Sequence, residues 1–192
     1  MRKLSVDDIV DHRAYERERD EFRARIIAMK RRRRIALGDL LTIVFENTDT
    51  MRFQVQEMAR AERMLADEAI ATEVRTYNEL IPDDGELSGT LFIELTNDAA
   101  LREWLHKFVN VQHHLHFELA DGSRVDAVPE DEERLTRDDV AATVHYLKFC
   151  FTPEQRDALT RGSTRLVVDH PLYAAVAELT DEQRAELAAD FA

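Results

Sequence analysis

The stretch LSGTLFIEL, residues 87–95, decides the fold class of this chain. Its apolar residues stand at every second position, which is the period of a β-strand with one buried face. Asn97 and Asp98 follow directly, and both residue types cap the N-terminus of a helix well. The next apolar residues, from Leu101 to Phe108, have helical spacing. A strand that leads at once into an amphipathic helix predicts an α+β protein.

The same order of elements recurs further along the chain. The segment LKFCFTPEQRDAL, residues 147–159, again reads as a strand, a threonine cap and an amphipathic helix, as does LFIELTNDAALREWL, residues 91–105. Each segment is followed by another strand, so a strand-helix-strand pseudo-repeat is one interpretation and convergent capping chemistry is the other. Residues 35–46 are expected to form either one mostly buried strand or a bent hairpin. Two more strands are expected on both sides of Asp121-Gly122, which is a strong signal for a hairpin turn. We therefore expect a small, mostly antiparallel sheet with helices on one face.

One domain is predicted for the whole chain, residues 1–192. Residues 1–34 form its basic helical segment, and residues 35–129 form the main sheet and helices. An acidic connector at 130–139 then leads to a C-terminal strand-helix-strand-helix unit at 140–192.

Composition narrows the classes of function. The 192 residues are 44% hydrophobic, enough for a real core, and the chain has five glycines and one cysteine, Cys150. A lone cysteine forms no internal disulfide, and no apolar run nears the roughly 20 residues that span a bilayer, so we expect a cytoplasmic protein away from membranes. The sequence has no Gly-rich phosphate-binding motif and no Cys-x-x-Cys pair. We expect no cofactor, and any redox role would act through contact with another protein.

Charge is distributed unevenly. Residues 1–34 carry a net +5, although the whole chain carries −13. The run Lys30, Arg31, Arg32, Arg33 and Arg34 closes the basic segment and is the candidate partner-binding site. It can bind an acidic protein or fold back onto acidic residues of the same chain, such as 130–139. Nucleic-acid binding is a further alternative, which the acidic body and the lack of interleaved aromatic residues disfavour.

Histidines provide the second candidate site. In HHLHFE, residues 113–118, a strand places His114, His116 and Glu118 on one face and the apolar residues on the other. Two imidazoles and a carboxylate are a ligand set for zinc or iron, and His170, at the end of a predicted strand, is a candidate fourth ligand. The alternative is a polar strand face in contact with water. The thiol of Cys150 lies beside Lys148, and an ammonium group there is one way to lower a thiol pKa. Because no second cysteine can resolve an oxidised form, we instead expect an inert thiol.

Several blocks resemble a known family. They are LSVDDIVDHRAYERERDEFRARIIAMKRRRR, VFENTDTMRFQVQEMARAE, TYNELIPDDGELSGTLFIEL, VHYLKF and VDHPLY. Together they resemble an uncharacterised bacterial family, domain of unknown function 3501, over nearly the whole chain. Genes of that family commonly lie beside genes for a rubrerythrin-like di-iron protein and a heterodisulfide-reductase-type iron–sulfur oxidoreductase. The resemblance implies a role in peroxide or redox stress but transfers no catalytic residue.

The main functional hypothesis is therefore a cytosolic accessory protein that binds a redox partner and has no assigned catalytic activity. A rubrerythrin-like or iron–sulfur protein would be that partner, and complementary charged surfaces would orient the two proteins. A metal-binding protein or metal-dependent enzyme at the histidine face is the alternative.

Overall fold

A computed structural model describes residues 1–95, 97–130 and 140–191 of the chain. The predicted acidic connector therefore lies, from residue 131 to 139, outside the described residues. Among the described residues, no helix has both the length and the apolar character needed to cross a membrane.

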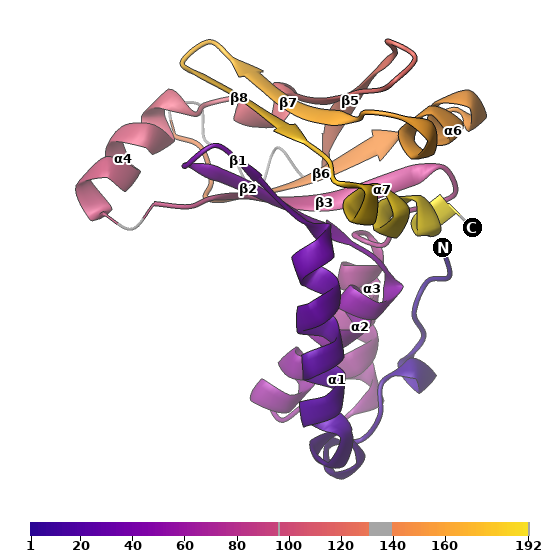
Figure 1. Cartoon of the computed structure of the whole chain (residues 1–192). Coiled ribbons are helices and arrows are strands. Elements are labelled where there is room, and N and C mark those ends of the chain that lie inside the picture. The colour runs from indigo at the N-terminus through magenta and orange to yellow at the C-terminus, as the bar shows by residue number, and fades with distance from the viewer. Residues whose placement is uncertain (96, 131–139, 192) are drawn as a thin grey trace.

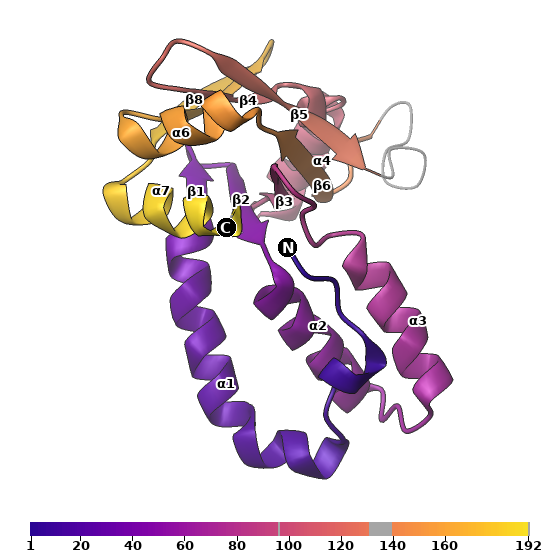
Figure 2. The same cartoon turned by 90° about the vertical axis from the view of Figure 1, so that its right-hand side faces the viewer.

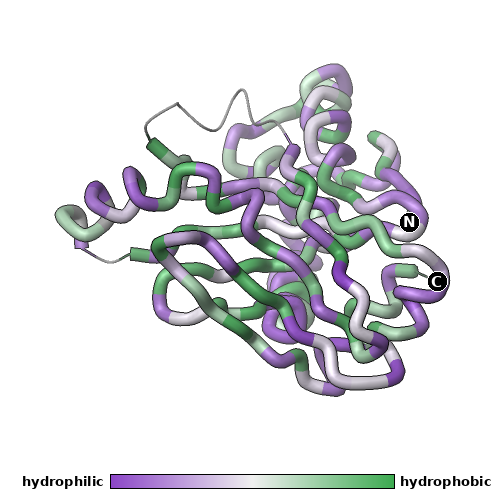
Figure 3. Tube along the Cα trace, turned by 90° about the horizontal axis from the view of Figure 1, so that it is seen from above, coloured by the Kyte–Doolittle hydropathy of each residue, from purple (hydrophilic) through white to green (hydrophobic). Residues whose placement is uncertain are grey.

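One eight-stranded sheet organises the molecule (Figure 1). Its strand order is β1-β2-β3-β6-β5-β4-β7-β8, and every neighbouring pair is antiparallel. The strands are β1 (Arg34–Leu37), β2 (Leu41–Glu46), β3 (Glu86–Ile93), β4 (Leu115–Glu118), β5 (Arg124–Glu130), β6 (Val144–Cys150), β7 (Arg165–His170) and β8 (Tyr173–Glu178). Figure 3 shows hydrophobic and hydrophilic segments alternating along these strands, as expected for a sheet with one buried face.

Helices begin mostly where the sequence offers a capping side chain. Asp11 accepts hydrogen bonds from the first-turn amides of α1, and Thr152 and Thr180 do the same for α6 and α7. The α-helices are α1 (His12–Arg33), α2 (Thr48–Ala61), α3 (Asp67–Asn78), α4 (Asp98–Lys107), α6 (Pro153–Arg161) and α7 (Asp181–Ala188). Short 3-10 helices η1 (Val6–Asp8), η2 (Val111–His113) and η3 (Ala189–Phe191) complete the set.

Both predicted strand-helix-strand segments are present. The first runs β3–α4–β4 and the second β6–α6–β7. They lie against each other in the sheet, because β3 pairs with β6 and β4 pairs with β7. The predicted fold class, an α+β protein with an antiparallel sheet preceded by a basic helical segment, is confirmed. Of the two interpretations of 35–46, the structure shows the hairpin, with its turn between β1 and β2.

The sheet is so strongly curved that its two edge strands approach each other. Tyr173, at the start of β8, reaches the β1–β2 turn: its hydroxyl donates to the carbonyl oxygen of Leu37 at 2.7 Å and accepts from the amide of Leu40 at 3.3 Å. Gly38 stands in this turn with a φ of +67°, a left-handed conformation that glycine adopts at low cost. The tyrosine thus joins the two edges of the sheet.

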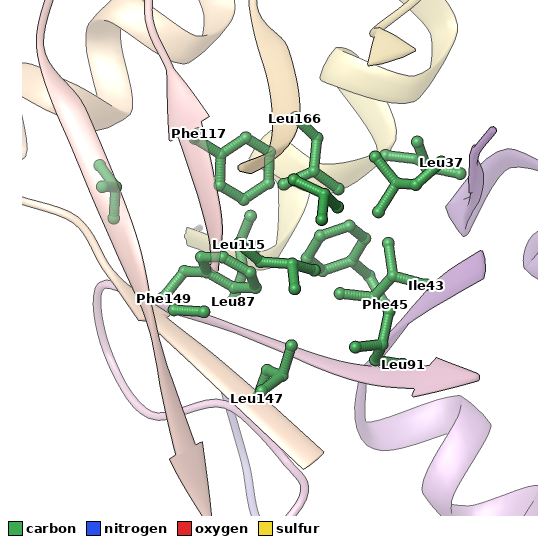
Figure 4. Packing of buried hydrophobic residues seen from close by; sticks show 14 of the residues in the cluster. Leu37, Ile43, Phe45, Leu87, Leu91, Leu115, Phe117, Leu147, Phe149 and Leu166 are labelled. Atoms are coloured by element: carbon green, nitrogen blue, oxygen red, sulfur yellow. The ribbon is translucent and has the colours of Figure 1, made fainter. Parts of the chain in front are cut away.

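Aromatic side chains fill the space inside the curved sheet (Figure 4). The rings of Phe45, Phe117 and Phe149 form a triangle with centroid distances of 5.7, 5.9 and 4.9 Å. All three side chains are fully buried. Because they come from β2, β4 and β6, this contact holds distant parts of the sheet together.

Helices α1, α2 and α3 project together from one side of the sheet (Figures 1 and 2). We call these helices and the N-terminal segment 1–11 the helical lobe. Its apolar residues form two clusters separate from the sheet core, one around Val55 and Val74 and the other around Phe22. The ring of Phe22 meets that of Phe53 edge-on at 5.5 Å, which joins α1 to α2.

Strand β8 is the main element that the sequence does not predict. Its residues YAAVAE include three alanines, which favour helices over strands. Tyr173, Ala175 and Ala177 pack against the core, whereas the alternate side chains are exposed. Pairing with β7 along the whole strand overrides the local preference.

Candidate functional site

The basic run that ends the first helix is packed against acidic residues of the same chain. Arg32 forms an ion pair with Glu186 of α7 at 2.7 Å, and Arg34 pairs with Glu94 at 2.9 Å. Lys30 lies 3.5 Å from a carboxylate oxygen of Glu46. These acidic residues belong to α7 and to the strand region, not to the connector 130–139.

Arg33 is the most enclosed member of this run. It is 1% exposed, and its guanidinium group is bound by the carboxylate of Asp190, one contact being 3.0 Å. The same group donates to the backbone carbonyl oxygens of Phe45 at 2.9 Å and Glu46 at 3.2 Å. A buried arginine is tolerated when its donors are satisfied in this way. Arg33 therefore fastens the C-terminus to the end of α1.

This placement changes what the basic run can offer a partner. Arg31 is exposed and forms no ion pair among the described residues, whereas Lys30, Arg32, Arg33 and Arg34 each face a carboxylate of the chain. The folded protein thus realises the alternative in which the basic segment docks onto its own acidic body. Binding of an acidic partner or of nucleic acid at this run stays a prediction, and four of its five cations would have to exchange partners.

The histidine motif lies on the outer face of the sheet. Leu115 and Phe117 of β4 point into the core, and His116 and Glu118 point outward, as the alternation predicts. The sequence did not predict how deeply His116 is covered: its side chain is 3% exposed, against 33% for His114. His116 lies between two carboxylates, with Nε2 3.7 Å from Glu118 and Nδ1 3.8 Å from Asp169.

Asp169 is the member of this cluster that sequence reasoning missed. It comes from β7, and its second oxygen lies 3.3 Å from Nδ1 of His114. Arg124 of β5 also reaches Asp169, at 3.3 Å. Burial acts to raise the pKa of Asp169, but the hydrogen bond with His114 and the nearby charges of His116 and Arg124 hold that pKa below its usual value. The cluster is therefore drawn from three neighbouring strands.

His170 is engaged elsewhere. Its Nδ1 accepts the amide hydrogen of Leu172 at 3.3 Å, so Nε2 carries the proton and donates to the carbonyl oxygen of Val109 at 3.2 Å. Burial lowers the pKa of His170, and the neighbouring His114 lowers it further. The ring of His170 meets that of His114 edge-on, with ring centroids 5.0 Å apart.

The predicted metal ligands are thus only partly brought together. His114 and His116 share Asp169, Glu118 stands on the far side of His116, and His170 is bound to the backbone. As these side chains stand, no group of three or more His, Cys, Asp or Glu among the described residues is arranged to hold a metal ion. Zinc or iron at His114, His116, Glu118 and His170 stays a prediction.

The thiol of Cys150 is not activated by its surroundings. Burial raises its pKa, and so does the carboxylate of Glu86, to which the thiol donates at 3.7 Å. Lys148 acts in the opposite direction but is itself held by Glu130 at 2.6 Å. The alternative of a lowered thiol pKa is therefore not realised, because burial raises that pKa and carboxylates hold the ammonium group that would lower it.

Lys148 also lines an open hollow of about 650 Å³ between α3, the N-terminal segment and β6. This volume lies in the range of small-molecule sites. Its charged groups balance, however: Lys3 faces Asp83 at 2.9 Å and Lys148 faces Glu130. The lining favours neither an anion nor a cation.

Comparison with known proteins places the chain in a family without defining its chemistry. No curated protein matches it. Its fold is similar to that in the crystal structure, at 1.90 Å resolution, of a novel protein of unknown function from Burkholderia pseudomallei K96243, with a TM-score of 0.91, 30% sequence identity and 100% of each chain covered. The family described as protein of unknown function (DUF3501) matches residues 3–191. The chain belongs to this family.

Proposed function

We propose that this chain is an accessory protein that binds a partner protein with a basic face. The observation that carries the proposal is the internal docking of the basic run: Arg32, Arg33 and Arg34 are each satisfied by acidic residues of the same molecule. The chain still carries a net charge of −13, so an acidic excess remains elsewhere on it. Such a field steers basic proteins toward the molecule and repels nucleic acid.

The resemblance noted in the sequence suggests which partners to test first. A rubrerythrin-like di-iron protein and a heterodisulfide-reductase-type iron–sulfur oxidoreductase would place this chain in the handling of peroxide or redox stress. The raised pKa of the single thiol, that of Cys150, disfavours the reactive thiolate form. This agrees with a protein that acts by binding its partner rather than by thiol chemistry of its own. The partner, rather than this chain, would carry the electrons.

Binding of each purified candidate to the immobilised full chain tests this function. We expect one of them to bind, with an association rate constant that falls steeply between about 20 and 500 mM salt because screening shortens the range of the attraction. Affinity capture from the native host, at rest and after peroxide treatment, should recover the same protein. If neither class binds, or if binding strengthens with salt, the proposal is contradicted.

A metal at the histidine cluster is kept as a second candidate because of one observation. Nδ1 of His116 is buried without a hydrogen-bond partner and faces Asp169, whose other oxygen contacts His114. Elemental analysis of the purified protein is the test. A stoichiometric zinc or iron content that disappears in the His114→Ala, His116→Ala double variant would support the site, and a wild-type protein free of both metals would refute it. Arg124, bound to Asp169, argues against a cation there.

A further inference from the structure

We propose that a small apolar pocket at the end of the helical lobe remote from the sheet docks a basic segment of a partner through one apolar side chain. The inference rests on the proposed function, in which the partner has a basic face. The pocket lies where η1 and the start of α1 meet the α2–α3 connection. In Figure 1 these parts are at the lower end of the molecule, far from the curved sheet.

The lining of the pocket is suited to an apolar group. It is formed mainly by aliphatic side chains, one methionine and the ring of Tyr15. The residues that carry the argument are Ile9, Val10, Ala59, Met64 and Ile70. Its volume is about 150 Å³. An apolar cavity of similar volume in another protein accepts benzene. The pocket is therefore large enough for one leucine or phenylalanine side chain.

Leu65 adds solvent-exposed apolar surface beside the pocket. It lines the pocket and is 82% exposed, more than any other large apolar side chain among the described residues. Leu172, on the β7–β8 turn, is the next most exposed at 60% and is not among the residues that line this pocket. Covering Leu65 with a partner would remove apolar area from water next to a site that already accepts an apolar group.

Acidic side chains surround the pocket. Asp11 and Asp67 line it, and the adjoining turns add further exposed acidic residues, namely Asp7, Glu62 and Glu68. Four of these carboxylates form no ion pair with another described residue, namely Asp7, Glu62, Asp67 and Glu68.

The cations nearby do not cancel this charge. Arg60 lines the pocket but is held by Glu16 at 2.5 Å, and His12 lies 3.8 Å from the same carboxylate. Arg63, in the α2–α3 connection, is the one exposed arginine of that turn. Arg13 and Arg17, at the start of α1, act on Asp11. On the α2–α3 side, the carboxylates of Glu62, Asp67 and Glu68 outnumber Arg63, so that side keeps a negative excess, which favours a lysine- or arginine-rich segment over an acidic or neutral one.

Three small probes that share a phenyl ring and differ in charge test the pocket: 2-phenylethylammonium, 2-phenylethanol and 3-phenylpropionate. We would titrate each into the isotope-labelled full chain and follow its amide and methyl NMR signals. The expected result is that Val10, Met64 and Ile70 shift, and that the cation binds more tightly than the alcohol and the anion most weakly. If none of these signals moves, or if the anion binds best, the proposal is overturned.

Matched variants separate charge from apolar contact. Asp67→Asn with Glu68→Gln should weaken binding of the cation about three- to tenfold at low salt and leave the alcohol unchanged. Asp181→Asn with Glu182→Gln, which removes two exposed acids from the first turn of α7, is the control for both the charge and the helix position. Leu65→Ser should weaken all three probes, whereas Leu172→Ser should weaken none.

The same variants distinguish this inference from the function on which it rests. If the full-length partner binds wild type but binds the Leu65 and Asp67/Glu68 variants equally well, the pocket proposal fails and the proposed function stands. If no basic partner binds although the probes behave as expected, the proposed function fails alone. A chain that forms dimers, and whose dimers are abolished by Leu65→Ser, would show that a second copy occupies the pocket and would overturn the choice of partner.

Discussion

At the scale of single residues, Arg33 offers the sharpest test of how the chain is held together. Arg33→Met removes the partner of the Asp190 carboxylate. Because that carboxylate is only 3% exposed, water cannot replace the lost partner. We expect a loss of about 3–5 kcal/mol in the free energy of unfolding. Denaturation by urea at pH 7 measures it.

The double variant Arg33→Met, Asp190→Leu is the control for this effect. Replacing both members of a buried ion pair by apolar groups is much less costly than removing one, so the double variant should recover a large part of the loss. Recovery would be incomplete, since the carbonyl oxygens of Phe45 and Glu46 still lose their donor. A single variant as stable as wild type would show that the pair contributes nothing.

Glu57 gives a prediction about pH. It accepts hydrogen bonds from Arg19 at 2.8 Å and from the hydroxyl of Tyr15 at 2.6 Å, and the Arg19 contact is the main reason that its pKa falls to about 2. A pKa lowered by folding stabilises the folded state above the ordinary carboxyl pKa and ceases to do so as the pH falls toward the folded value. Wild type should exceed Glu57→Gln in stability at pH 7, and the difference should vanish between about pH 5 and pH 2.

Unfolding of both proteins by urea over that pH range measures the difference. Glu21→Gln, an exposed acid of α1 without an ion pair among the described residues, should run parallel to wild type. A difference between wild type and Glu57→Gln that is independent of pH would refute the assigned pKa.

At this scale the sequence could not rank the five cations of the basic run. Lys30, Arg31, Arg32 and Arg33 are adjacent and chemically alike, and helical geometry turns only one of them fully inward. Which one depends on the carboxylates of α7 and η3, more than 150 residues away in the chain. Charge counting therefore identified the run but not its partners.

At the scale of elements, the contact between the sheet edges is open to a direct test. Tyr173→Phe removes the hydroxyl that joins Leu37 and Leu40 and should cost about 1–3 kcal/mol, since it leaves a donor and an acceptor without this partner. The amide of Leu40 should then exchange faster with deuterium. Tyr146→Phe is the control, because the hydroxyl of Tyr146 forms no hydrogen bond to another described residue. Unchanged exchange at Leu40 would contradict the assigned role.

Elements were predictable where a local signal was sufficient. Thr152 and Thr180 mark helix starts, and Asp121-Gly122 marks a hairpin, because capping and turn chemistry act within a few residues. Strand β8 was missed since its alanines carry no strand preference and its pairing with β7 is a tertiary contact. Capping and turn residues thus predicted the helices and the hairpin, whereas strand β8 is determined by its pairing with β7.

The candidate histidine site shows the same limit. Alternation along β4 correctly put His116 and Glu118 on one face. Asp169 could not be found from spacing, because the register of β4 against β7 brings it to the histidines from a strand 55 residues away from His114. His170 was expected beside them as a ligand and is instead tied to the backbone at Val109.

At the scale of the whole molecule, the separation of the hydrophobic clusters predicts unequal local stability. Strands β3 and β6 are paired on both sides and packed on the sheet core, whereas α3 buries one residue fully, Val74. Segments with few buried apolar contacts open at lower free energy than the core. In hydrogen–deuterium exchange under native conditions, the amides of α3 should therefore exchange faster than those of β3 and β6.

This inequality also links the helical lobe to its docking pocket. Ile70 and Asp67 of α3 line that pocket, so a group bound there favours the closed form of the helix by mass action. Saturation with 2-phenylethylammonium should slow exchange in α3 and leave exchange in β3 unchanged, and Asp67→Asn with Glu68→Gln should reduce the slowing. Equal exchange rates in α3 and β3 without the probe would mean that the lobe and the sheet unfold as one unit. The pocket would then have no local opening to suppress.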